Sequence, residues 1–491
     1  MKKQTLLLAV TIMAGYASAQ TLLVNTGDVT YTIPARQAGE MNYQSGKTIL
    51  IGNKSYSLSE ITNIEVTDSE VTDSRVDVVY NGNSAHVTIA GNIAQYLSPT
   101  VKGAHVSIVA TSDLDQEITY SLRGSTTNGS FYMSGKYDQT LELNGVTLNN
   151  PDSAAVNLQN GKRTRVVITG GSTNNFSDGL TGSDDGSDGH KAAFYIEGHA
   201  KWSGAGVASI TGNVKHAYFS DEYTLFESTL GTLLFNSKDG DGMHVNQYFK
   251  MQGGIVEIIS GSDGIDVGKK KTEKELNGCL LIEGGTLSVS TNGVAGKALK
   301  CEGDMTIGGG TITATTSGTA VYDSSANDFS SCAGAKCDGT FTMTGGTVSL
   351  TSTGAGGKGL NSTGNIQISG GTLTVVTTGS VYKSGEDDTK PQGIKSDGNI
   401  TLSGGKVLSC ASSDSGTAFK TDFYVYTNGA TVMGIGGKAT TPSSSSTHGY
   451  KKYSNVNVTG GSTLSYDGVT FTIPSLYSNS NGKVVVSSSS M

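Results

Sequence analysis

A pair of glycines followed by an alternating apolar stretch recurs along the chain, and this repeat limits the possible folds more than any other feature. The second glycines of successive pairs are 31, 25, 36, 25 and 34 residues apart. We interpret 25 residues as the basic unit and the longer steps as the same unit with loop insertions. The pairs are Gly253-Gly254, Gly284-Gly285, Gly309-Gly310, Gly345-Gly346, Gly370-Gly371 and Gly404-Gly405.

An apolar position, preceded by a small residue and followed by a polar one, accompanies the repeat. Several steps between these positions are 22, 24 or 25 residues. Such steps are too short for a strand-helix unit and suit a turn of three short strands. We therefore expect ten coils, with stacked apolar positions at Val156, Phe194, Tyr218, Met243, Ile265, Leu299, Ala335, Leu360, Ile394 and Phe419.

The predicted fold is all-β, a right-handed parallel β-helix (solenoid) of about ten coils with small β modules at the ends. Each strand would pair with the same strand of the next coil. The 68 glycines among 491 residues would occupy corners that require positive φ. A propeller blade needs a longer repeat, and a sandwich shows no such period. Right-handedness is favoured by the chirality of crossover connections.

The ends of the chain lie outside the repeat. Residues 1–19 are typical of a secretory signal peptide cleaved before Gln20, which predicts export. We expect a small β module or cap over residues 20–70, strands leading into the solenoid over 71–112, the solenoid over 113–440 and a β-rich cap over 441–491. No later apolar run is long enough for a membrane helix, and the net charge of -8 argues against a nucleic-acid partner. We expect a monomer.

Acidic residues occupy two positions of successive coils. Asp239, Asp241, Asp263 and Asp266 would meet at one corner, where carboxylates repel one another unless a cation joins them. Calcium fits such an all-oxygen set, although Asp-Gly turns explain the same residues. A second acidic group, Asp178, Asp184, Asp185 and Asp188, does not fit an EF-hand loop and favours a solvated loop.

Lysines occupy the same two positions in the repeats that follow the acidic residues. A row of ammonium groups suits a linear polyanion such as a uronate chain, whereas the alternative is a solvated face. Residues that would bind this ligand are His244, Lys297, Lys300, Lys336, Lys358 and Lys395. Two of the five cysteines, Cys332 and Cys337, lie close enough in sequence to close a small loop, and the other three are interpreted as buried apolar residues.

Catalysis has little support in the sequence. Hydrolase triads and zinc signatures such as H-E-x-x-H are absent. The stronger enzymatic hypothesis is a calcium-dependent polysaccharide lyase, in which calcium would acidify a uronate proton and Lys297 or Lys300 would remove it. A surface adhesin without enzymatic activity is a further alternative.

Several motifs resemble those of a secreted bacterial family of carbohydrate-binding proteins. They are Asn144-Gly145-Val146-Thr147-Leu148-Asn149-Asn150, Lys215-His216-Ala217, Lys238-Asp239-Gly240-Asp241-Gly242-Met243-His244 and Ser262-Asp263-Gly264-Ile265-Asp266-Val267. The resemblance covers roughly residues 115–430 and implies a right-handed parallel β-helix similar to pectate lyases. It also implies that calcium and acidic polysaccharides such as polygalacturonate are bound. The extra Asp241-Gly242 departs from the family pattern and leaves the ligand set open.

Overall fold

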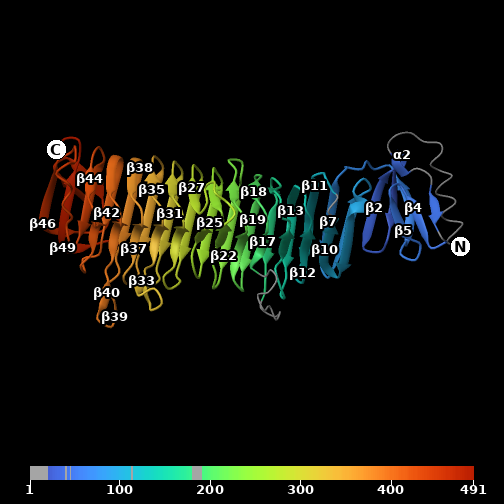
Figure 1. Cartoon of the computed structure of the whole chain (residues 1–491), viewed down its shortest axis with the longest axis horizontal. Helices are drawn as coiled ribbons and strands as arrows, with labels where there is room; N and C mark the ends of the chain where they lie inside the picture. Colours follow the sequence, from blue (N-terminus) through green and yellow to red (C-terminus); the bar gives the residue numbers. More distant parts are fainter. Residues whose placement is uncertain (1–19, 39–40, 45, 112–113, 180–190) are drawn as a thin grey trace. The chain divides into compact units, whose positions relative to one another are not determined.

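The computed structural model describes residues 20–491 except 39–40, 45, 112–113 and 180–190 (Figure 1). The described chain is all-β with long parallel-strand sheets, and its helices are α2 (Ala35–Ala38) and the 3-10 turn η2 (Ala94–Tyr96). No helix in this part of the chain is long and apolar enough to cross a membrane. The predicted signal peptide and the acidic residues Asp184, Asp185 and Asp188 lie outside the described residues.

The chain forms two compact units, Met1–His190 with Phe194–Ala208, and Lys191–Ala193 with Ser209–Met491. In the first unit, β1 pairs antiparallel with β2 and β6, and β3, β4 and β5 form a separate small sheet. Parallel pairing joins β7 to β11, β11 to β13 and β13 to β15, and also β10 to β12 and β12 to β14. The strands are β1 (Thr21–Asn25), β2 (Val29–Pro34), β3 (Asn42–Gln44), β4 (Thr48–Ile51), β5 (Lys54–Ser57), β6 (Asn63–Thr67), β7 (Arg75–Asn81), β8 (Ser84–Ala90), β9 (Leu97–Lys102), β10 (Ala104–Ala110), β11 (Ile118–Thr126), β12 (Gly129–Ser134), β13 (Gln139–Asn149), β14 (Val156–Gln159), β15 (Thr164–Ile168), β16 (Thr173–Ser177) and β18 (Ala200–Ser203).

The second unit contains a parallel ladder, here called the site ladder, with one strand from each repeat. Its pairing places Tyr218, Met243, Ile265, Leu299, Ala335, Leu360, Ile394 and Phe419 opposite one another in that order. Within the first unit, Val156 faces Phe194 in the same way. These pairings confirm the predicted apolar column within each of the two units. The strands are β20 (His216–Ser220), β23 (Met243–Asn246), β26 (Ile265–Gly268), β29 (Lys297–Cys301), β34 (Ala333–Cys337), β37 (Lys358–Ser362), β41 (Gln392–Ser396) and β43 (Thr417–Thr421).

Two further parallel ladders of this unit supply the other strands of each repeat. The long strands β38 and β42 each take part in both of these ladders. The first of these ladders contains β21 (Thr224–Phe226), β24 (Tyr248–Met251), β27 (Cys279–Ile282), β30 (Met305–Ile307), β35 (Phe341–Met343) and β44 (Val425–Thr427). The second contains β22 (Thr232–Ser237), β25 (Ile255–Ser260), β28 (Thr286–Thr291), β31 (Thr311–Thr316), β36 (Thr347–Ser352) and β45 (Thr431–Gly436). The strands shared by both are β38 (Ile366–Thr377) and β42 (Ile400–Cys410).

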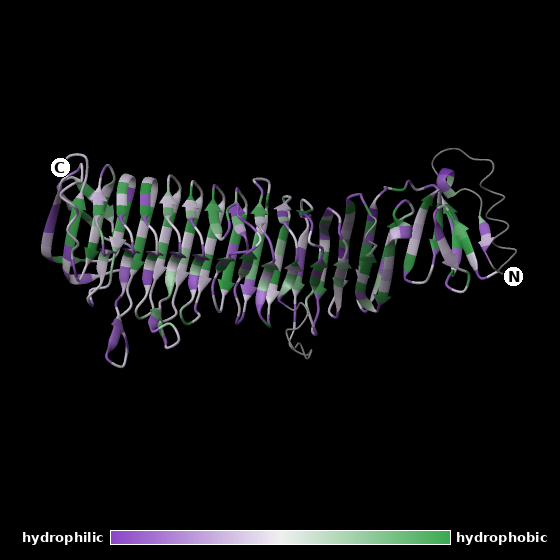
Figure 2. Ribbon diagram, viewed as in Figure 1, coloured by the Kyte–Doolittle hydropathy of each residue, from purple (hydrophilic) through white to green (hydrophobic). Residues whose placement is uncertain are grey.

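Burial alternates along the strands, so the apolar residues of each repeat contribute to a shared core. Figure 2 shows hydrophobic and hydrophilic residues interspersed along the strands. The glycine pairs lie where neighbouring repeats approach each other closely. The second glycine of each pair has φ between 78° and 89°. A Cβ on Gly345 would lie only 2.4 Å from the Gly308 carbonyl oxygen of the preceding repeat, so a side chain there would separate the two repeats.

Two antiparallel hairpins interrupt the repeats of the second unit: β32 (Val321–Asp323) with β33 (Asp328–Ser330), and β39 (Tyr382–Ser384) with β40 (Asp387–Thr389). Both project beyond the neighbouring strands of the unit (Figure 1). At the C-terminus, β49 (Asn479–Ser487) pairs antiparallel with β45 and with β46 (Tyr450–Val458), and β47 (Thr463–Tyr466) pairs with β48 (Val469–Thr472). Val484 and Val486 of β49 pack with Met433 and Ile435 of β45, which covers the last apolar residues of the core.

Candidate functional site

The site ladder holds its polar side chains in two positions of the repeat. The residue after each apolar position points outward, and the register aligns His244, Asp266, Lys300, Lys336, Asn361, Lys395 and Lys420. The second position lies two residues before the apolar one, either in the turn before the strand, as for Asp241 and Asp263, or at its first residue, as for Lys297 and Lys358. The first polar row therefore runs without a break along these repeats, whereas in the second Ala333 lies between Lys297 and Lys358.

The acidic part of the ladder is centred on Asp241, whose side chain is only 8% exposed. Its Oδ2 lies 3.2 Å from Nδ1 of His216 and 3.2 Å from Nδ1 of His244. Its Oδ1 accepts the backbone N–H of Asp263 at 3.0 Å. The Phe219 ring stacks on His244 with 4.7 Å between ring centroids, which holds the imidazole in place. We call His216, Asp241 and His244, with Asp263 and Asp266, the acid–histidine cluster.

A lysine pairs with the other two carboxylates of this cluster. Lys300 Nζ lies 3.0 Å from Oδ2 of Asp263 and 3.0 Å from Oδ2 of Asp266. Asp266 Oδ2 also lies 3.5 Å from Nδ1 of His244. The partners come from neighbouring repeats, so the cluster forms only when the repeats stack in register.

The protonation states follow from these contacts. Burial alone would raise the pKa of Asp241, but the hydrogen bonds with His216 and His244 lower it well below its usual range. Burial would lower the pKa of His244, yet the hydrogen bonds to Asp241 and Asp266 raise it to about 9. Burial raises the pKa of Asp263, and the attraction of Lys300 acts against this shift.

The predicted calcium ligands do not assemble as a set. Asp239 points to solvent with 70% of its side chain exposed, and its ion pair is with Lys238 at 3.9 Å. Asp241, Asp263 and Asp266 do lie together, but imidazoles and the Lys300 ammonium already lie within 3.5 Å of their oxygens. Calcium takes six to eight oxygen ligands, so the residues present do not fit it.

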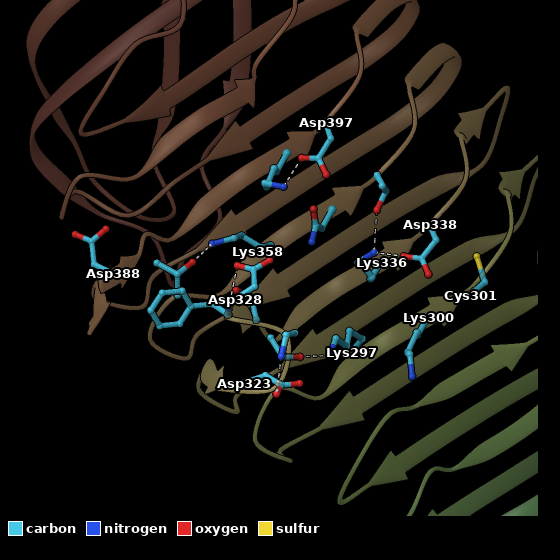
Figure 3. Close-up of a pocket in the computed structure, with 18 residues that line it drawn as sticks. Lys297, Lys300, Cys301, Asp323, Asp328, Lys336, Asp338, Lys358, Asp388 and Asp397 are labelled. Atoms are coloured by element: carbon cyan, nitrogen blue, oxygen red, sulfur yellow. Dashed lines mark hydrogen bonds and ion pairs between the residues drawn. The ribbon is translucent and has the colours of Figure 1, made fainter. Parts of the chain in front are cut away.

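A cavity of about 480 Å³ lies beside the lysine part of the ladder (Figure 3). Five lysines and five aspartates line it, so the wall offers both hydrogen-bond donors and acceptors rather than a purely cationic surface. The charged residues are Lys297, Lys300, Lys336, Lys358, Lys395, Asp323, Asp328, Asp338, Asp388 and Asp397.

Two of the cavity lysines are partly exposed, and each pairs with a more exposed carboxylate just after the end of its own strand. Lys336 pairs with Asp338 and also donates to Thr363 Oγ1 at 3.2 Å. Lys395 Nζ lies 2.5 Å from Oδ1 of Asp397. Lys420, next along the column, pairs with Asp422 in the same way but does not line the cavity. These exposed pairs exchange partners at little cost, because surface ion pairs contribute only about 0–1 kcal/mol.

Lys297 and Lys358 contact the hairpins. Lys297 Nζ donates to Ser330 Oγ at 3.0 Å, at the end of β33. Lys358 is 4% exposed and donates to the carbonyl oxygens of Gly356 and Lys390 and to Thr389 Oγ1, at 3.0, 2.5 and 2.9 Å. Burial, followed by repulsion from Lys395, lowers the pKa of Lys358 to about 7. Both lysines reach from the ladder to the inserted hairpins.

The hairpins contribute aromatic residues that the sequence analysis did not identify. Phe329 of β33 lines the cavity. Its ring centroid lies 5.1 Å from that of Tyr322 and 6.0 Å from that of Tyr382 on the other hairpin. No sequence period marks these residues, because they lie in insertions between repeats.

His216 was also missed, although the repeat contains the signal for it. It lies two residues before Tyr218, the same position that Asp241 and Asp263 occupy before Met243 and Ile265. The five cysteines are all free, so Cys332 and Cys337 do not form the small disulfide loop considered above. Cys332 Sγ instead lies 3.5 Å from Ser352 Oγ, within the core.

Comparison with known proteins gives a family. A solved structure of a polysaccharide lyase-like protein from C. thermocellum, a gadolinium derivative, is similar to part of the chain, with 17% identity, a TM-score of 0.44, and coverage of 55% of this chain and 96% of that one. No curated protein matches the sequence significantly. The model of the carbohydrate-binding domain-containing protein family matches residues 102–379 and 339–437, which include the whole cavity wall and the acid–histidine cluster. The chain therefore belongs to the family of carbohydrate-binding domain-containing proteins.

Proposed function

We propose that this protein binds an acidic, polygalacturonate-like polysaccharide in the cavity beside the lysine part of the site ladder. The observation that carries the proposal is that Lys336, Lys395 and Phe329 line the same cavity. A uronate unit carries a carboxylate and several hydroxyl groups. The lysines suit the carboxylate, the hairpin aspartates Asp323, Asp328 and Asp388 accept from hydroxyl groups, and an aromatic ring packs against the apolar face of a sugar.

The test compares two polymers that differ only in charge: polygalacturonate and the same polymer with its carboxylates reduced to alcohols. We expect the wild-type protein to bind the first and to bind the second at least about tenfold more weakly. Equal binding to both polymers would disprove the acidic specificity. Failure to bind either polymer, or any glycan on an array, would favour the adhesin alternative.

The matched variants follow from the cavity. Replacing Lys336 and Lys395 together with Ala should weaken polygalacturonate binding at least about tenfold, because two charge-assisted hydrogen bonds are lost. Lys420→Ala is the control, since Lys420 forms the same kind of ion pair outside the cavity. Lys297 and Lys300 are less suitable, because they bind Ser330 and the acid–histidine cluster.

We propose no calcium ligand for this function. In the acid–histidine cluster the chain itself supplies the positive charge, so polygalacturonate binding should persist after treatment with a chelator. Loss of binding on chelation, restored by calcium alone, would contradict this expectation.

A lyase is the second candidate, because the cavity contains an amine whose pKa is about 7. A neutral Lys358 is able to take the proton next to a uronate carboxylate, after which the neighbouring C–O bond breaks and a C=C bond forms. Its burial and three hydrogen bonds favour binding over catalysis. Ultraviolet absorbance of unsaturated products would support the lyase, and its absence at high protein concentration would exclude it.

The finer features of the fold and location are also part of this proposal. The three ladders of the second unit suit the sheets of a right-handed parallel β-helix, whose handedness a crystal structure would establish. The pattern of residues 1–19 supports export, in which case the protein recovered from the culture medium should begin at Gln20.

A further inference from the structure

We propose that His216, Asp241 and His244 form a binding site for a divalent transition metal of the zinc class. The proposal does not depend on polysaccharide binding, because none of the three residues lines the lysine cavity. His216 begins β20, Asp241 lies in the turn before β23, and His244 lies on β23. Two successive repeats therefore supply all three ligands.

The spacing of the three side chains suits tetrahedral coordination. Their ligand atoms all lie within 4.8 Å of one another. The two distances from Asp241 Oδ2 to the histidine Nδ1 atoms are both 3.2 Å. Zinc bonds to nitrogen and oxygen of about 2.0–2.2 Å in a tetrahedron separate neighbouring ligands by about 3.3 Å. One ion would thus contact all three atoms with little movement of the side chains.

Nδ1 of His216 lies close to two atoms of Asp241, the backbone nitrogen at 3.0 Å and the carboxylate Oδ2 at 3.2 Å. A single ring nitrogen cannot accept the backbone N–H and donate to the carboxylate at the same time, so these two contacts compete. A metal ion between Nδ1 and Oδ2 would satisfy the carboxylate contact in place of a proton, and the backbone N–H would then be released from Nδ1.

The make-up of the cluster suits a divalent ion. It contains the three carboxylates of Asp241, Asp263 and Asp266, and Lys300 Nζ contacts the last two of them. Oδ2 of Asp241 faces the two imidazoles, so a metal ion bound by these imidazoles would take the place of a proton beside this carboxylate.

The surroundings resemble the support that metal ligands need. The Asp263 N–H fixes the Asp241 carboxylate through Oδ1, and Phe219 stacks on His244. The His244 side chain is 23% exposed, whereas His216 and Asp241 are 10% and 8% exposed. Two imidazoles select a borderline ion rather than calcium, and three protein ligands leave a fourth position for water or an oxygen of a bound molecule.

Cobalt(II) is the probe, because its visible absorption distinguishes four-coordinate from six-coordinate sites. Full-length protein stripped of metal should bind one equivalent and show the intense absorption of a four-coordinate ion. One equivalent of zinc should remove this absorption, whereas excess calcium should not. His216→Ala and His244→Ala should both lose the signal, and His448→Ala, a histidine outside the cluster, should keep it.

A second measurement keeps the test decisive if an alanine variant unfolds. His244→Gln preserves a polar side chain, and circular dichroism reports whether it folds. Zinc should raise the melting temperature of the wild type and not that of folded His244→Gln. Absence of cobalt binding would show that the cluster holds protons only. Equal competition by calcium, or an unchanged spectrum in His216→Ala, would equally overturn the proposal.

Discussion

The acid–histidine cluster and the lysine part of the site ladder occupy the same position of the repeat but satisfy their charges in opposite ways. In the cluster, the carboxylates of Asp241, Asp263 and Asp266 are only 8–13% exposed and take partners from neighbouring repeats. Among the lysines, Lys336 and Lys395 pair with an aspartate two residues along the same chain, and these two aspartates are 51% and 45% exposed. A buried network across repeats stabilises the stack, whereas a local exposed pair is easily exchanged for a ligand.

The largest effect should come from breaking the cluster at its centre. Asp241→Ala would leave His244 charged and the Asp263 N–H without its acceptor in a buried site. We expect a loss of about 3–5 kcal/mol in the free energy of unfolding, measured by denaturant titration of the circular dichroism signal. Asp239→Ala, at the exposed neighbouring carboxylate, should stay within about 0.5 kcal/mol of wild type. Similar losses in both variants would show that the buried and the exposed carboxylate contribute equally to stability.

The second prediction concerns Lys358, which lies in the lysine part but is buried like the cluster. Its pKa is about 7 in the folded protein and near 10.5 when unfolded, so the unfolded chain holds more protons between these values. Stability should therefore rise as pH increases from about 7 toward 10, by at most about 1.4 kcal/mol per pH unit, and be lowest below pH 7.

Lys358→Met isolates this contribution, because the other titrating groups are unchanged. The melting temperature of wild type, compared between pH 6.5 and 9, should increase more than that of the variant. Parallel pH profiles for the two proteins would mean that the three hydrogen bonds keep the ammonium charged throughout.

The smallest effect should come from releasing one surface lysine. Asp338→Asn removes the carboxylate that competes with a ligand for Lys336, so polygalacturonate should bind about two- to fivefold more tightly, as measured by calorimetry. Asp422→Asn releases Lys420 outside the cavity and should leave affinity unchanged. A decrease in affinity after Asp338→Asn would indicate that this aspartate itself binds the ligand.

The repeat made much of the fold and of the ladder predictable. Alternating apolar residues and glycine pairs specify strands and corners locally, and the register that follows aligns Met243 with Ile265 and His244 with Asp266. The same register would have located His216. Asp239 was placed in the cluster only because it is close in sequence to Asp241. The turn before β23 directs one carboxylate inward and leaves the other in solvent.

The sequence alone determined which residues share a strand position, because each repeat encodes its own strands and stacking reproduces them at a constant spacing. The sequence could not determine which side chains these residues contact. Whether Lys358 meets solvent or the β39–β40 hairpin, and whether Phe329 reaches the cavity, depends on how the insertions fold back over the ladder. Those contacts join residues about 30 positions apart without any period, so only the tertiary structure decides them.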